Sequence, residues 1–404
     1  MSLAIGLNSG SSFDGVDAVL IETGLDPDGF PTPPRFMEAI SLDWPQEVQP
    51  QVLAAFSNKL SLFELTRLNY VVGAVFAEAA TTLLDHAGVS AADIAVIGYD
   101  GQTVYQEPPE PEQMRAVSEA ARPYQRWTSG GFPCGLQIGE PGVVAALTDI
   151  ATVTQFRSVD HALGGTGAPL MQFLDFVAFR HLAPIATLNI GGISNIQVAD
   201  RDRVRMRAFD CGPGNVMIDH AMHRFFGQAY DADGATAARG RVHPPMLQQL
   251  LEHPFFTRPI PRCAWRLDFG ADYADAVLDT YAALPPEDLV ATLTRFSAEA
   301  ITRAFIDLIP QVTDIDTLIA SGGGVRNATL LNEITQLLPD RVLLTRSDDY
   351  GLPAQYKEAI KFATLAVATQ HGIGNNIPAA SGAARFGVLG KLVLPPHQAR
   401  LTDI

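Results

Sequence analysis

Cysteine is scarce in this chain of 404 residues, which contains only Cys134, Cys211 and Cys263. The three residues are far apart, odd in number and never spaced as Cys-x-x-Cys. A disulfide framework needs paired cysteines, and a zinc knuckle needs closely spaced ones. The sequence supports neither, and we expect three plain buried thiols.

Basic residues are also few, because 28 Lys and Arg stand against 44 Asp and Glu, for a net charge of −16 at pH 7. Nucleic acids and anionic membranes are bound over a broad basic face. The charge therefore disfavours both as partners. Any phosphate site must be local, built from backbone N–H groups and a metal ion.

Long hydrophobic runs are missing, although 47% of the residues are hydrophobic. No run reaches the roughly 18 residues that a membrane-spanning helix needs. The start, MSLAIGLNSG, has neither the basic region nor the cleavage pattern of a signal peptide. We therefore expect a cytoplasmic protein. At about 150 residues per domain, the length predicts two or three domains, and we expect two. Whether it forms a homodimer stays open.

Glycine and hydroxyl residues gather in a loop near the N-terminus. In LAIGLNSGSSFDGVDAVLIE an apolar strand breaks at residues 8–12 and resumes after Asp14. Such a loop can turn backbone N–H groups toward phosphate oxygens, and the Asp14 carboxylate can meet them through a cation. We interpret it as a phosphate loop formed by Gly10, Ser11 and Ser12.

A second segment, ATLNIGGISNIQVA at 186–199, repeats the plan of strand, glycine turn and strand. One such hairpin is usually only a tight turn, but its repetition suggests a duplicated chain that holds phosphates between the two turns. In SGGGVRN, three glycines between a strand and a helix would let an adenine or a ribose lie on the backbone. The nucleotide candidates of this half are Gly191, Gly192, Asn195, Gly212, Gly214, Gly322, Gly323 and Asn327.

Carboxylates near these loops are candidates for Mg²⁺, which prefers oxygen ligands and keeps several waters. Asp14 and Glu358 are the best candidates, and Asp210 is a weaker third. Glu358 starts a helix and complements the helix dipole equally well. His220 and His223 share a helix face without a third ligand at matching spacing, so we interpret them as ordinary helix surface.

Seven motifs in order resemble those of the anhydro-N-acetylmuramic acid kinase family, in the sugar kinase and actin-like ATPase superfamily. They are GLNSGSSFDGVDAVL, GQTV, LQIGEP, FRSVDHALGGTGAPL, LNIGGISNI, FDCGPGN and KEAIKFA, from residue 6 to about 365. Alternating strands and helices already predict a mixed α/β protein. The resemblance implies two actin-like (ribonuclease H-like) domains with an ATP cleft between them. The first spans 1–183 plus 353–404, and the second, with the second phosphate loop and the adenosine site, spans 184–352.

The resemblance also implies the reaction. Water opens a 1,6-anhydro bond at the anomeric carbon, while the freed O6 takes the γ-phosphoryl group of ATP, with Mg²⁺ as the metal. The Asp of the family's F-R-x-x-D element, here Asp160, is the base that takes the proton from water. From the residues alone, an Asp160 that merely caps the following helix is the simpler interpretation. The implied sugar-binding residues are Asp100, Gln102, Thr103, Arg157 and Asp160.

Departures from the family pattern lie on the sugar side. The family usually has His where this chain has Asp100, two Arg where it has Ser158 and Val159, and Gln where it has Thr166. These changes predict a more negative pocket, in which an anionic sugar binds less well. The segment 105–135, rich in Pro and Glu without clean periodicity, is expected to be a surface excursion or lid.

Two alternatives follow. The chain is a levoglucosan kinase-like enzyme for a neutral anhydrohexose, or it is a non-catalytic ATP-binding regulatory protein. The retention of Asp160 together with Asp14 and Glu358 disfavours the second, because a nucleotide switch needs no base on its sugar side.

Overall fold

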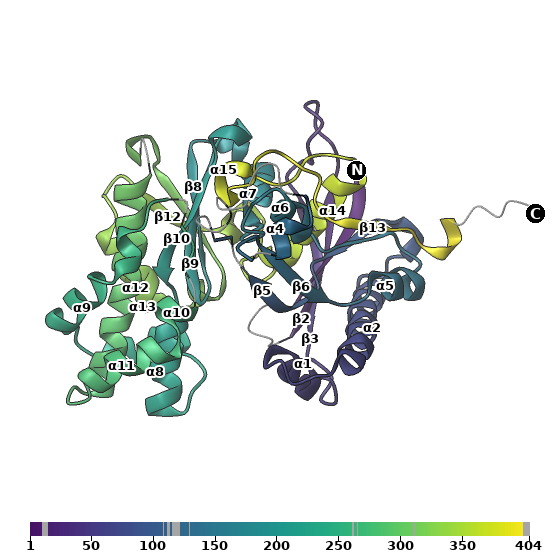
Figure 1. Cartoon of the computed structure of the whole chain (residues 1–404). Coiled ribbons are helices and arrows are strands. Elements are labelled where there is room, and N and C mark those ends of the chain that lie inside the picture. The colour runs from purple at the N-terminus through teal and green to yellow at the C-terminus, as the bar shows by residue number, and fades with distance from the viewer. Residues whose placement is uncertain are drawn as a thin grey trace, which may run out of the picture. The chain divides into compact units, whose positions relative to one another are not determined.

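A computed structural model describes residues 1–9, 15–107, 109–110, 114, 122–128, 130–260, 262–264, 266–309 and 312–398. The chain forms two compact units, Met1–Ala178 with Tyr356–Ile404, and Phe179–Gln355 (Figure 1). The expected phosphate-loop residues Gly10, Ser11 and Ser12, and the metal candidate Asp14, lie outside the described residues. Within the described part of the chain, no helix is long and apolar enough to cross a membrane.

The first unit is built on a six-stranded sheet of order β13-β7-β4-β1-β2-β3. Strands β1, β2 and β3 pair antiparallel, whereas β4 runs parallel to both β1 and β7. Helix α2 (Leu62–Ala87), which begins with a capping box formed by Ser61 and Glu64, packs on this sheet. The strands are β1 (Ser2–Asn8), β2 (Val16–Thr23), β3 (Arg35–Leu42), β4 (Ile94–Tyr99), β7 (Thr152–Thr154) and β13 (Lys391–Val393).

The two faces of this sheet are covered by different helices, because successive side chains of a strand point to opposite sides. Ile5 and Leu7 of β1 join the core with Val72 and Phe76 of α2. The alternate positions face α14 (Lys357–Gln370), which packs on β1 and β4. There a Cβ at Gly6 would lie 1.9 Å from the Ala359 carbonyl oxygen. Glycine is therefore required for this close approach of helix and strand.

The second unit is built on a five-stranded sheet of order β10-β9-β8-β11-β12. Its first three strands pair antiparallel, and β11 runs parallel to both β8 and β12. Numbered within each sheet, the strands of both have the order 3-2-1-4-5, with β13 added at the edge of the first. This order is that of the actin-like, ribonuclease H-like fold, so the predicted fold class is confirmed. The strands are β8 (Ile185–Ile190), β9 (Ile193–Ala199), β10 (Arg207–Pro213), β11 (Thr317–Ser321) and β12 (Leu343–Arg346).

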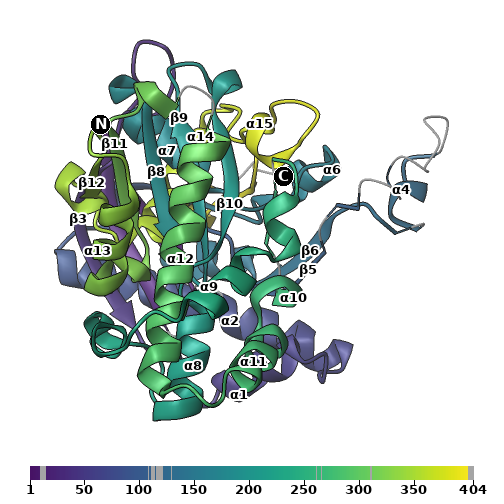
Figure 2. The same ribbon diagram turned by 90° about the vertical axis from the view of Figure 1, so that its left-hand side faces the viewer.

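Helices α12 (Pro286–Leu308) and α13 (Ala328–Leu337) lie side by side over one face of the second sheet (Figures 1 and 2). They bury Leu188, Ile196 and Phe209 of the strands. A further core is formed by α8 (Val216–Phe226), α9 (Pro244–Leu251), α10 (Arg266–Phe269) and α11 (Ala271–Thr280) together with α12.

The segment 105–135 is only partly described, and its ends are regular. Strands β5 (Gln102–Glu107) and β6 (Cys134–Ile138) form a separate two-stranded antiparallel sheet, and α4 (Gln125–Thr128) lies between them in sequence. Among the described residues of the first unit, the other α-helices are α1 (Gln49–Phe56), α5 (Pro141–Thr148), α6 (Arg157–Ala162), α7 (Met171–Phe179, which ends at the unit boundary) and α15 (Pro378–Ser381). All three cysteines are free, but only Cys211 is fully buried, so the expectation of three buried thiols is wrong for Cys134 and Cys263.

Replacing Gly98 of β4 by Ala tests the packing of α14. The new Cβ would lie 2.1 Å from the Phe362 carbonyl oxygen, so the helix must shift. We expect the free energy of unfolding to fall by roughly 1–3 kcal/mol, measured by urea denaturation. Gly142→Ala in α5 is the control, because its Cβ meets nothing closer than 3.4 Å. Equal losses for the two variants would contradict this packing argument.

Candidate functional site

The polar cluster of the first unit centres on Asp160, which lies within α6 and is 1% exposed. Its Oδ1 accepts hydrogen bonds from Ser381 Oγ at 2.8 Å and from Asn376 Nδ2 at 3.1 Å. Its Oδ2 accepts one from the Gly167 N–H at 2.9 Å. These partners all lie outside the helix that follows, α7, so the interpretation of Asp160 as a helix cap is wrong.

The glycine-rich loop after α6 is shaped by Asp160 and His161. A Cβ at residue 165 would lie 2.2 Å from Asp160 Oδ2, and one at residue 167 would lie 2.0 Å from His161 Nε2. Both positions therefore exclude a side chain. Burial lowers the pKa of His161, and the nearby Arg157 lowers it further, so both favour the neutral imidazole. The sequence interpretation missed His161, whose buried Nε2 has no hydrogen-bond partner among the residues that the structure describes.

Asp100 and Arg157 form an ion pair at the end of β4. Asp100 Oδ2 accepts from Arg157 Nε at 2.5 Å, and Asp100 Oδ1 accepts from the Phe156 N–H at 3.2 Å. Arg157 Nη1 also donates to Gln106 Oε1 at 2.7 Å, and Gln106 Nε2 donates to the Thr166 carbonyl at 3.1 Å. Asp100 is therefore not a free carboxylate, because Arg157 balances its charge.

The other two sugar-side candidates lie on β5. Gln102 is 1% exposed, and its Oε1 accepts from Ser9 Oγ at 2.7 Å. Ser9 in turn accepts from Trp44 Nε1 at 3.0 Å. Thr103 follows on the same strand and is half-buried. Gln102 thus supports the residue that precedes the expected first phosphate loop.

Glu358 lies in the first turn of α14, with 42% of its side chain exposed, and accepts from Lys361 Nζ. Burial opposes its ionisation, but Lys361, Lys357 and Arg157 outweigh burial and lower its pKa. An ionised, partly exposed carboxylate suits a magnesium ion that keeps most of its waters. Among the residues that the structure describes, no group of three or more His, Cys, Asp or Glu could hold a metal ion.

The glycine candidates of the second unit meet around the end of β8. The Gly214 N–H donates to the Gly192 carbonyl at 2.8 Å, and a Cβ at Gly214 would lie 2.3 Å from the Gly191 carbonyl oxygen. Gly212, at the end of β10, reaches the same turn through its pairing with Ser194. These contacts bring Gly191, Gly192, Gly212 and Gly214 into one region.

The glycine turn after β11 joins the same region. Gly322 has φ +85°, and a Cβ there would lie 2.7 Å from both Asn189 Oδ1 and the Ile190 carbonyl oxygen. A Cβ at Gly323, by contrast, would meet nothing within 4 Å. Asn327 caps α13, where its Oδ1 accepts from the Leu330 N–H at 2.9 Å.

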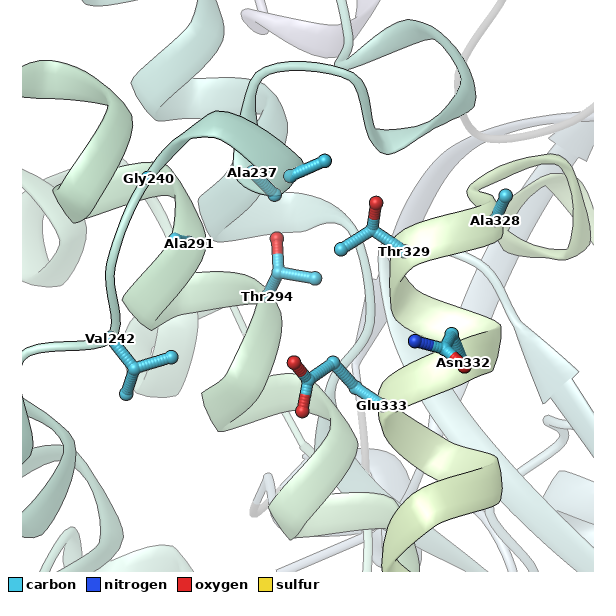
Figure 3. Close-up of a pocket in the computed structure, with 10 residues that line it drawn as sticks. Ala237, Gly240, Val242, Ala291, Thr294, Ala328, Thr329, Asn332 and Glu333 are labelled. Carbon is cyan, nitrogen blue, oxygen red and sulfur yellow. The ribbon is translucent and has the colours of Figure 1, made fainter.

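A pocket of about 410 Å³ adjoins this cap (Figure 3). Thr294 comes from α12, whereas Thr329 and Glu333 come from the first turns of α13, and the three side chains face the same space (Figure 3). The volume is within the range of small-molecule sites. Its lining residues are Ala237, Ala238, Gly240, Val242, Ala291, Thr294, Ala328, Thr329, Asn332 and Glu333.

Asp210, the weaker metal candidate, is held by the segment after α9. Its Oδ2 accepts from the Ala264 N–H at 2.7 Å. Burial raises the pKa of Asp210 to about 7, although the Ala264 N–H and Arg262 oppose the rise. His220 Nε2 forms a hydrogen bond with Asp275 Oδ1 at 2.8 Å.

Comparison with known proteins adds independent findings. The family model described as "Anhydro-N-acetylmuramic acid kinase" matches residues 2–395. A protein of that name from Caldanaerobacter subterraneus subsp. tengcongensis is 36% identical over 403 residues, which cover 97% of each chain. A protein of the same name from Clostridioides difficile is 33% identical, and the match covers 97% of this chain and 98% of the relative. Another, from Bacillus cereus (strain AH820), is 32% identical, and the match covers 97% of this chain and 99% of the relative.

Replacing Asp100 by Asn tests the ion pair with Arg157. The change leaves the arginine, 19% exposed, without its counter-charge. We expect a loss of roughly 1–3 kcal/mol in the free energy of unfolding, less than for a fully buried pair. Arg35→Gln is the control, because it breaks the exposed pair with Glu22 and should cost about 1 kcal/mol or less. A loss no larger than in the control would argue against a structural pair.

Replacing Asp210 by Asn tests the raised pKa. A carboxyl whose pKa rises on folding binds a proton more tightly in the folded state, so its contribution to stability falls as the pH rises from about 4 to 7. The amide oxygen keeps an acceptor for the Ala264 N–H but does not titrate. We expect the variant to have a larger free energy of unfolding than the wild type at pH 8, and the difference between the two proteins to be much smaller at pH 5. Unfolding at both pH values measures the difference, and a gain independent of pH would refute it.

Proposed function

The chain belongs to the anhydro-N-acetylmuramic acid kinase family, and from that premise we propose that it hydrolyses and 6-phosphorylates 1,6-anhydro-N-acetylmuramic acid with ATP. The product would be N-acetylmuramic acid 6-phosphate, recovered from the cell wall. Because the reaction consumes ATP, we place it in the cytoplasm. The observation that carries the proposal is the fixed carboxylate of Asp160 beside a glycine loop.

The hydrogen bonds of Asp160 leave one position for a substrate water. An ionised carboxylate has about four lone-pair sites, two on each oxygen. Oδ1 already accepts from Ser381 and Asn376, whereas Oδ2 accepts, within the described part of the chain, from the Gly167 N–H alone. A side chain at residue 165 would block Oδ2, because its Cβ would lie 2.2 Å from that oxygen. We therefore assign Oδ2 as the atom that takes the proton from water as it attacks the anomeric carbon.

ATP would be held by the second unit. Gly192 is exposed at the β8–β9 turn, where backbone N–H groups are suited to phosphoryl oxygens. The open space at Gly323 and the neighbouring pocket would take the nucleoside. In the first unit, Glu358, with Asp14, would hold Mg²⁺, whose charge neutralises the phosphoryl oxygens.

A neutral 1,6-anhydrohexose, such as levoglucosan, is the second candidate substrate. Arg157 is the cation nearest to Asp160 in sequence, and it already binds Asp100 and Gln106. A substrate carboxylate would have to compete with the buried carboxylate of Asp100 for it. That competition favours a sugar without a lactyl group.

Replacing Asp160 by Asn tests the mechanism. The amide keeps the shape of the side chain but cannot take a proton, so we expect kcat to fall by roughly 10²–10⁴-fold while the nucleotide Kd hardly changes. Release of ADP, followed with the anionic anhydrosugar, with levoglucosan and with free hexoses, measures turnover and substrate choice.

The control is Arg35→Gln, which breaks the exposed ion pair with Glu22 and should keep wild-type turnover. Thermal unfolding checks that both variants are folded. Wild-type turnover in Asp160→Asn would remove Asp160 from the mechanism. A wild type that releases no ADP with any anhydrosugar would overturn the proposed function.

A further inference from the structure

The second sheet has two chemically different faces. Residues such as Leu188, Ile196 and Phe209 face the apolar core under α12 and α13. The alternate positions of the same strands are polar, and their register pairs Thr187 with Gln197 and Asn195 with both Asn189 and Asp210. Cross-strand partners lie on the same face. The sheet therefore carries a row of polar side chains, which we call the polar ladder: Thr187, Asn189, Asn195, Gln197 and Asp210.

Three members of the polar ladder form a directed hydrogen-bond chain. Thr187 Oγ donates to Gln197 Oε1 at 2.8 Å, and Gln197 Nε2 donates to Asn195 Oδ1 at 2.5 Å. Thr187 and Gln197 are completely buried, and Asn195 is 9% exposed. A buried amide must place its donor and its acceptor against matching partners. Thr187 acts as the donor here, so Gln197 turns its Oε1 to the hydroxyl and its Nε2 to the Oδ1 of Asn195.

This series of hydrogen bonds leads to Asn195 and fixes the orientation of its amide. Its oxygen is used by Gln197, so the two N–H donors of its Nδ2 face away from Gln197. Asn195 stands directly opposite Asn189, close to the Gly191-Gly192 turn. Phosphoryl oxygens only accept hydrogen bonds, so an amide that presents Nδ2 attracts them and one that presents Oδ1 repels them.

We propose that Gln197 is a positioning residue that holds the Asn195 amide with its Nδ2 toward the phosphoryl groups of ATP. The inference rests on the proposed function, which puts ATP phosphates at this turn. Neither Gln197 nor Thr187 touches the nucleotide in this arrangement. They select one of the two orientations of the Asn195 amide before ATP binds, so that no binding energy is used to order this amide.

Gln197→Glu tests the orientation directly. At a pH at which the new carboxyl is ionised, it has the same length and still accepts from Thr187, but it cannot donate to Asn195. The Asn195 amide must then turn its Nδ2 to Glu and present Oδ1 to the phosphates. We expect the Kd of ADP with Mg²⁺, measured by calorimetry, to rise about tenfold to a hundredfold. The KM for the anhydrosugar should stay unchanged.

A double-mutant cycle separates positioning from a general structural role. Asn195→Ala removes the donor, and adding Gln197→Glu to it should then have no further effect on the Kd of ADP. An unchanged Kd in Gln197→Glu, or a loss that persists in the Asn195→Ala background, would overturn the inference. A wild type that does not bind ADP would instead overturn the proposed function beneath it.

A second variant keeps the test open if a buried carboxyl prevents folding. Thr187→Val has nearly the same shape but lacks the hydroxyl that fixes Gln197, so either amide orientation becomes available. We expect a severalfold rise in the Kd of ADP, whereas Thr187→Ser, which keeps the hydroxyl, should bind like the wild type. Equal affinities of the Val and Ser variants would count against the directed chain.

Discussion

The buried carboxylate of Asp160 is the constraint on which the first unit depends. A charge without water is costly unless hydrogen bonds replace those that water made. Ser381 and Asn376 supply two of them from the C-terminal segment, although they stand more than 200 residues away along the chain. That segment is fastened nearby by the Thr166 N–H, which donates to the Ser381 carbonyl at 2.8 Å. The return of the chain to the first unit therefore completes the surroundings of the proposed base.

The ion pair of Asp100 and Arg157 extends this arrangement. Gln106 connects Arg157 with the Thr166 carbonyl, so the end of β4, the strand β5, the start of α6 and the glycine loop belong to one network. Asp100 and Thr166 are two of the positions at which the sequence departs from the family it resembles. The structure shows that these two departures lie in the same network. Changes at such positions are expected to be coupled in energy, rather than independent.

The sequence could predict the fold because its signals are local. Each sheet begins with an apolar strand, a glycine turn and an apolar strand, and residues 186–199 display that pattern without help from the rest of the chain. Asp160 was found through the motif around it. Asn376 and Ser381 carry no such signal, because their importance arises only when a distant segment folds beside α6. The pairing of Asp100 with Arg157 was missed for the same reason.

Gln197 is a different case, since a local signal was present. Thr187 and Asn189, and then Asn195 and Gln197, are polar residues two positions apart in otherwise apolar strands. Period-two polarity in a strand whose other face is core indicates a second face with its own chemistry. The sequence could not say whether that face met water or another part of the protein. In the structure, 91% or more of Thr187, Asn195 and Gln197 is buried, so these side chains are shielded from water.

The two sheets have the same strand order, but their corresponding faces differ in the side chains that they carry. In the first, the face opposite α2 carries Gly6 and Gly98, which let α14 lie against bare backbone. In the second, the face opposite α12 and α13 carries the polar ladder. The two sheets thus have equivalent faces with different side chains. In the first sheet this face packs against a helix, and in the second it carries hydrogen-bonding groups. Since a helix packed as closely as α14 would leave buried polar groups unsatisfied, a single face cannot serve both purposes.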